Sequence, residues 1–139
     1  MKKFEFIILT LILALGFLTR LYHFTYPVAD WHSWRQSDTS AISRNFVKYG
    51  FDILHPRFDD LSNVPSGIYD NPKGYRFVEF PIYNVLQAGG FILFGNFTIE
   101  QWVRLVTIFS SLLSSVFLYL IVKMHLNGFA GLLAAFILD

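Results

Sequence analysis

Two long apolar stretches set the strongest constraint on what this chain can fold into. Residues 6–18 are apolar apart from one glycine and one threonine, and with its flanks the segment 4–24 is about long enough to cross a bilayer, which needs roughly 20 helical residues. A second stretch, 102–122, follows Thr98 and Gln101, whose spacing is that of a capping box at a helix start. We therefore predict transmembrane helices over 4–24 and 102–122.

The composition agrees with a lipid environment. Hydrophobic residues make up 54% of the chain and charged residues 15%, a balance that is high for a soluble domain and ordinary for a bilayer protein. The net charge is +1 and the basic residues are scattered singly, so we expect no nucleic-acid partner. The chain has no cysteine, which excludes a disulfide, a thiolate nucleophile or a cysteine metal site within it.

The first apolar stretch also has features of a cleaved signal peptide. Lys2 and Lys3 precede an apolar centre, as in such peptides. No small-x-small cleavage site follows, because Arg20, Tyr22 and His23 occupy the place where it should lie. We favour an uncleaved helix.

A third apolar segment, 128–139, is shorter than the roughly 20 residues that a crossing needs. We expect it to be the start of a truncated third transmembrane helix. Because unpaired backbone groups are not left in hydrocarbon, we also expect the natural protein to continue with further helices.

The orientation follows from the basic residues next to the apolar stretches. If Lys2, Lys3, Lys123 and His125 are cytoplasmic, residues 26–101 form an extracytoplasmic loop. Loops longer than about 60 residues are largely exempt from the positive-inside rule, so the basic residues of this loop are no objection. The predicted fold is an all-α integral membrane fold with a large extracytoplasmic first loop that contains surface helices. The expected location is the cell membrane, as in a bacterial inner membrane.

One surface helix is predicted over 37–49. Ser37 is a suitable N-cap, Asp38 falls in the first turn and Gly50 is a stop signal. Four apolar residues fall on one side of this amphipathic helix: Ala41, Ile42, Phe46 and Tyr49.

A second surface helix is predicted over 80–94. Pro81 stands at a helix-start position and Gly95 at the end. The segment is apolar but too short to span, so we expect an interfacial or re-entrant helix at the outer leaflet.

The densest group of ionisable residues follows the first apolar stretch: Asp30, His32, Arg35 and Asp38. A carboxylate near the membrane surface, partly desolvated and beside an arginine, can accept a proton from a hydroxyl group, which is general-base chemistry. A purely structural network of ion pairs is the alternative. Asp30 with His32 is also a candidate for a divalent cation, but two ligands without fixed spacing are a weak signal, and we expect no metal.

Further basic residues suit a phosphate. Arg76 lies shortly before the predicted 80–94 helix, together with Glu79 and Tyr83, and a guanidinium fork matches phosphate geometry. Arg104, near the outer end of the second apolar stretch, has the same two interpretations as Arg76, a substrate phosphate or a lipid headgroup.

The order of these features resembles the start of the GT-C membrane glycosyltransferases, in particular bacterial proteins of the protein O-mannosyltransferase and aminoarabinose transferase type. The most specific match is residues 30–46, DWHSWRQSDTSAISRNF. Residues 79–83, EFPIY, are similar to a segment where the aminoarabinose transferases have a lysine and two prolines. Arg104 with Leu105 matches the Arg-Leu that opens their second span.

The resemblance implies transfer of a sugar, with inversion, from a polyprenyl-phosphate donor to a hydroxyl on a lipid, glycan or protein at the extracytoplasmic face. The fragment alone would be inactive. In that family the catalytic base is a carboxylate on the first external loop, which makes Asp30 the first choice here and Asp38 the reserve.

This chain departs from the family pattern at two places. The family's Asp-Glu pair, counted back from the helix arginine that Arg44 matches, falls on Arg35 and Gln36, and its lysine is replaced by Phe80. The phosphate contact would then come from Arg76 or Arg35. The full set of expected substrate-binding residues is His32, Trp34, Arg35, Arg44, Arg76, Glu79, Tyr83 and Arg104.

A non-enzymatic membrane protein, such as a transporter or an assembly subunit with a structural external loop, is the competing interpretation. Transporters usually place functional charges within their spans. Here the spans are nearly free of charge and the polar groups collect in the loop, which favours an enzyme at the outer face.

Overall fold

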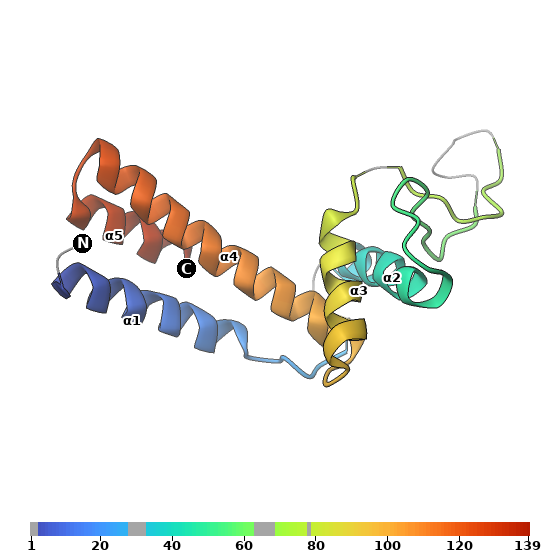
Figure 1. Ribbon diagram of the computed structural model, residues 1–139, viewed down its shortest axis with the longest axis horizontal. Coiled ribbons are helices and arrows are strands. Elements are labelled where there is room, and N and C mark those ends of the chain that lie inside the picture. The colour runs from blue at the N-terminus through green and yellow to red at the C-terminus, as the bar shows by residue number, and fades with distance from the viewer. Residues whose placement is uncertain (1–2, 28–32, 63–68, 78) are drawn as a thin grey trace. The chain divides into compact units, whose positions relative to one another are not determined.

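The structure, a computed structural model, describes residues 3–27, 33–62, 69–77 and 79–139. These residues form the helices drawn in Figure 1: α1 (Lys3–Arg20), α2 (Ser33–Tyr49), α3 (Ile82–Phe94), α4 (Ile99–His125) and α5 (Gly128–Leu138). No strand occurs in the described part of the chain, where one isolated antiparallel bridge joins Arg57 to Tyr75. The predicted all-α class is confirmed.

The chain divides into two compact units. Unit 1 consists of Met1–Phe24 and Thr107–Asp139, and unit 2 of Thr25–Val106. Helix α4 therefore contributes its first turns to unit 2 and the rest to unit 1.

The core of unit 1 joins α1, α4 and α5. It is formed by Leu9, Tyr119, Leu132 and Ala135, which are all buried. Gly131 of α5 lies so close to α4 that a Cβ atom there would be 2.7 Å from the carbonyl oxygen of Tyr119. The missing side chain is what lets the two helices approach closely.

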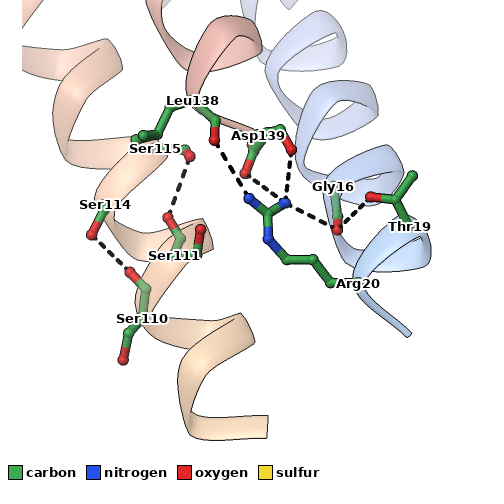
Figure 2. Close-up of polar contacts among 9 residues, drawn as sticks. All are labelled: Gly16, Thr19, Arg20, Ser110, Ser111, Ser114, Ser115, Leu138 and Asp139. Atoms are coloured by element: carbon green, nitrogen blue, oxygen red, sulfur yellow. Dashed lines mark hydrogen bonds and ion pairs between the residues drawn. The ribbon is translucent and has the colours of Figure 1, made fainter. Parts of the chain in front are cut away.

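Polar contacts at both ends of α1 hold it against the other helices of unit 1. At one end, Lys123 donates to Glu5 at 2.5 Å and the Tyr119 hydroxyl donates to the same carboxylate oxygen at 3.2 Å. At the other end, the Arg20 guanidinium donates to the carbonyl oxygens of Gly16, Leu138 and Asp139 (Figure 2). Arg20 thus meets the carbonyl end of α5, where a cation is favourable.

The serines of α4 bond within their own helix. Ser114 donates to the carbonyl of Ser110, and Ser115 to that of Ser111 (Figure 2). Ser115 is fully buried in unit 1, whereas Ser110 and Ser114 are exposed. The side of α4 that carries Ser110 and Ser114 is therefore accessible to a neighbouring helix.

Unit 2 is held together by α2 packed on α3 (Figure 1). Its apolar core contains Ala41, Ile42 and Phe46 of α2 together with Phe58 and Ala88. The predicted apolar side of α2 is confirmed for its three core residues. Tyr49 is the exception, since it is 59% exposed.

Helix α2 begins earlier than predicted. It starts at Ser33 rather than Ser37, so Ser37 is not the N-cap and Asp38 lies beyond the first turn. The segment before Ser37 contains neither Gly nor Pro, and Ser33 is also a residue type that favours helix starts. The added turn carries Arg35.

The ends of the other helices follow local signals. Thr98 and Gln101 form the predicted capping box, in which each backbone N–H donates to the other's side chain, at 3.0 and 3.3 Å. Gly95 ends α3 in a left-handed conformation, with φ of 62°. Helix α1 ends at Arg20, four residues before the predicted position, and His23 just beyond it has φ of 61°.

Among the described residues, α4 is long and apolar enough to cross a membrane. Its 27 residues correspond to about 40 Å of helix, against a hydrocarbon core of about 30 Å. Helix α1 has 18 residues and carries Lys3, Glu5 and Arg20 near its ends. The other predicted crossing, over 4–24, therefore stays a prediction.

Candidate functional site

A pocket of about 150 Å³ lies in unit 2 between the first turns of α2 and the segment that leads into α3. Both of the charged regions of the sequence contribute to it, one through Arg35 and Asp38 and the other through Arg76 and Glu79. The residues that line it are Arg35, Asp38, Thr39, Ile42, Arg76, Glu79, Phe80, Tyr83 and Asn84.

The register of α2 presents four of these residues together. Arg35, Asp38, Thr39 and Ile42 stand at positions i, i+3, i+4 and i+7 of the helix, and this spacing places them on one face. Because α2 begins at Ser33, Arg35 is already helical and shares that face with Asp38. A helix starting at Ser37 would have left Arg35 in the preceding loop.

Two ion pairs cross the pocket from α2 to the segment before α3. Arg76 contacts Asp38, with 2.8 Å between the guanidinium nitrogen and the carboxylate oxygen, and Arg35 contacts Glu79. The first pair is the more enclosed, since its side chains are 21% and 30% exposed against 56% and 65% for the second. An enclosed pair is less screened by solvent and holds its geometry more firmly.

Arg76 has two further neighbours. Its guanidinium lies 4.8 Å from the centre of the Phe58 ring, a cation–π contact. Its charge also contributes to lowering the pKa of Asp60, after the larger effect of hydrogen bonds from the side chain and backbone of Ser62. Arg76 is therefore held between a carboxylate and an aromatic ring.

A buried polar network lies next to the pocket and fixes α3 to α2. The side-chain amide of Asn84 donates to the Thr39 carbonyl at 2.8 Å and to the Ser43 hydroxyl at 3.2 Å. Ser43 in turn donates to the side-chain carbonyl of Gln87 at 2.5 Å. Since Thr39 and Asn84 line the pocket, this network sets the separation of its walls.

Three other predicted site residues, Trp34, Arg44 and Arg104, do not line the pocket. Trp34 is 62% exposed and does not line the pocket. Arg44 pairs with Asp59 and Glu100, at 3.3 and 3.0 Å. Arg104 donates to the carbonyl of Pro27. Asp30 and His32, the first-choice base and its neighbour, lie outside the described residues.

Four lining residues, Thr39, Ile42, Phe80 and Asn84, were not among the predicted site residues. Thr39 stands four positions after Arg35, and Ile42 four positions after Asp38, so the helical period alone would have placed both on the face that holds those two residues. Ile42 was expected only in the apolar side of the helix. Tyr83, which was predicted, lines the pocket while its hydroxyl donates to the carbonyl of Val103 at 3.3 Å.

The sequence also contains candidate ligands for a divalent metal ion. Within the described ranges, no three His, Cys, Asp or Glu side chains come together in a group that could hold a metal ion. The two candidate ligands named from the sequence, Asp30 and His32, are outside those ranges.

The chain was compared with protein-family models, with curated proteins and with solved structures, and none of the three comparisons found a match. Any functional conclusion therefore depends on the residues of the pocket and on the apolar helices.

Proposed function

We propose that this chain contributes to a membrane glycosyltransferase that transfers a sugar from a polyprenyl-phosphate donor to a hydroxyl acceptor at the extracytoplasmic face, with inversion. The observation that carries the proposal is the pocket with Asp38 and Arg76 in contact and Arg35 one helical turn away. A carboxylate and two guanidinium groups around one cavity supply a base for the acceptor and cations for a leaving phosphate.

The exposed apolar side chains of unit 1 support the membrane location. Only 17% of the most apolar part of α4 is buried, whereas the core helix of a soluble protein would be mostly enclosed. Large apolar residues are also exposed along α1 and α5, and soluble monomers rarely expose contiguous apolar surface of that extent. Examples are Phe6, Leu11, Leu15 and Leu18 of α1, and Phe129, Phe136 and Ile137 of α5.

In the proposed reaction Asp38 is the general base. Its carboxylate takes the proton of the acceptor hydroxyl as the hydroxyl oxygen attacks the anomeric carbon of the donor sugar. The bond between that carbon and the phosphate oxygen breaks, and polyprenyl phosphate leaves with the electron pair. Attack from the side opposite the leaving group inverts the anomeric carbon.

Arg35 is the better placed ligand for the leaving phosphate. Its pair with Glu79 is more than half exposed, and exposed pairs contribute only about 0–1 kcal/mol, so a phosphate can replace the carboxylate at little cost. Arg76 is more enclosed and keeps Asp38 in position. This division gives each arginine a separate role.

Asp30 stays an alternative base on the strength of the family resemblance. The two candidates are separated by parallel substitutions in the natural protein, with each variant reconstituted in lipid and supplied with polyprenyl-phosphate-linked sugars. We expect Asp38→Asn to lower sugar transfer about a hundredfold or more, the usual contribution of a general base. Asp70→Asn, at an exposed position of unit 2, is the matched control and should transfer normally.

The competing function is a non-enzymatic membrane protein whose loop is held by ion pairs. The observation in its favour is that both arginines of the pocket already have carboxylate partners. Exchanging the two residues, Asp38→Arg with Arg76→Asp, distinguishes the two functions. A purely structural pair is restored by the exchange, whereas a base is not, so recovered transport or assembly function in the exchanged protein would refute the enzyme proposal.

A further inference from the structure

A second pocket in unit 2, of about 360 Å³, has a lining that suits an anionic ligand. Phe58 connects the two sites, because it lines this pocket while its ring contacts Arg76, which lines the first. The residues that line the second pocket are Asn45, Tyr49, Arg57, Phe58, Asp59, Leu61, Pro72 and Lys73.

Two cations of this pocket lack a carboxylate partner. Within the described part of the chain, no Asp or Glu oxygen pairs with Arg57 or Lys73. Asp59 is the carboxylate that lines the pocket, and it is paired with Arg44 at 3.3 Å. Arg57 and Lys73 therefore leave the pocket with uncompensated positive charge.

Aromatic rings hold these cations without using up their hydrogen-bond donors. The guanidinium carbon of Arg57 lies 5.7 Å from the centre of the Tyr49 ring and 5.6 Å from that of Tyr75. The ammonium group of Lys73 lies 5.8 Å from the Tyr75 ring. A guanidinium that contacts aromatic rings through its face keeps the N–H groups at its edge available for an oxyanion.

The size of the pocket and its other polar groups indicate more than a simple ion. Its volume lies within the range of small-molecule sites, about 300–1,000 Å³, and an inorganic phosphate would fill only part of it. The Tyr49 hydroxyl and the Asp59 carboxylate can exchange hydrogen bonds with the hydroxyl groups of a sugar. The Asn45 amide donates to Asp59 at 3.3 Å and to the Arg57 carbonyl at 3.0 Å, which fixes both residues at the pocket.

We infer that this second pocket binds an anionic saccharide, a sugar that carries a phosphate or carboxylate group. Resting on the proposed function, we assign it to the acceptor, bound next to the Phe58 ring that contacts Arg76. Arg57 and Lys73 bind the anionic group, and the tyrosine and carboxylate side chains select for the sugar.

Binding can be measured without any transfer reaction. Purified protein in detergent is titrated with glucose 6-phosphate, glucuronate, glucose and inorganic phosphate, and heat release is recorded. We expect glucose 6-phosphate and glucuronate to bind more tightly than glucose or inorganic phosphate. Inorganic phosphate binding as tightly as glucose 6-phosphate would overturn the saccharide assignment, and no binding of either anionic sugar would overturn the site.

Substitutions locate the binding. Lys73→Gln and Arg57→Gln should each weaken glucose 6-phosphate binding roughly tenfold or more, the effect of losing a hydrogen bond to a charged group. Arg57→Lys keeps the charge if Arg57→Gln fails to fold. The matched control is Lys48→Gln, because Lys48 also lies over Tyr49, at 4.9 Å, but does not line the pocket. Unchanged binding in Lys73→Gln and Arg57→Gln, or equal weakening in Lys48→Gln, refutes the inference.

The two proposals fail separately. Asp38→Asn should lower transfer about a hundredfold or more and leave glucose 6-phosphate binding intact. Normal binding in Lys73→Gln together with loss of transfer in Asp38→Asn removes the second site alone. Normal transfer in Asp38→Asn, with binding lost in Lys73→Gln, removes Asp38 as the base and keeps the second site.

Discussion

The buried network between α2 and α3 predicts opposite effects for two neighbouring substitutions, Asn84→Leu and Gln87→Met. Asn84 donates two hydrogen bonds, to Thr39 and Ser43, and is 7% exposed. Gln87 is fully buried, and its side-chain N–H₂ group has no acceptor among the described residues although its carbonyl accepts from Ser43. The two amides therefore contribute differently to the stability of unit 2.

The magnitudes follow from these contacts. Asn84→Leu loses two hydrogen bonds at about 0.5–1.5 kcal/mol each, a destabilisation of about 1–3 kcal/mol. Gln87→Met loses one bond of about 1 kcal/mol and removes a buried unpaired donor that costs about 1–3 kcal/mol. Ser43 keeps a second acceptor, the Thr39 carbonyl at 3.1 Å. We expect Gln87→Met to range from neutral to about 2 kcal/mol more stable.

Tryptophan fluorescence during heating is a suitable assay. The two tryptophans that the structure describes, Trp34 and Trp102, both belong to unit 2, so their signal reports that unit. For a unit of this size 1 kcal/mol shifts Tm by about 4–8 °C, which puts the expected loss for Asn84→Leu at about 4–24 °C. A fall in Tm for Gln87→Met as large as that for Asn84→Leu would refute this account of the network.

Two further predictions concern unit 1 and the topology. Gly131→Val should lower the thermal stability of the detergent-solubilised protein, because the added Cβ would lie 2.7 Å from the Tyr119 carbonyl oxygen. The control Gly89→Ala, whose Cβ would have nothing within 4 Å, should be neutral or slightly stabilising. Equal effects of the two substitutions in circular-dichroism melts would contradict the close packing of α4 and α5. The chain has no cysteine of its own, so Asp70→Cys introduces a single thiol into the predicted extracytoplasmic loop. This thiol should react with a membrane-impermeant maleimide in intact cells. Labelling only after lysis would place residues 26–101 in the cytoplasm.

Local signals predicted the helices well. The Thr98–Gln101 capping box and the Gly95 stop depend on residues within one or two turns of each other, and both occur as expected. The start of α2 was misplaced because Ser33 and Ser37 are equally good starting residues in the sequence. Tyr49 was assigned to the apolar side on helical period alone, yet the core of unit 2 ends before it.

The sequence predicted the charged residues of the candidate site but not which of them contact one another. Asp38 and Arg76 were both selected from the sequence for their chemistry. Their contact joins positions 38 residues apart, and no periodicity of the sequence between them relates the two residues. The same holds for the second pocket, whose basic residues Arg57 and Lys73 both contact the ring of Tyr75 although they are 16 positions apart in the chain.

Because α2 starts at Ser33, the site depends on the number of helical residues between Arg35 and Asp38. Each residue inserted into an α-helix rotates the preceding part of the helix by about 100° relative to the part after the insertion. One alanine inserted between Gln36 and Ser37 would carry Arg35 off the face that holds Asp38, without altering any side chain of the pocket. The number of residues in this single turn is therefore as much a part of the site as their identity.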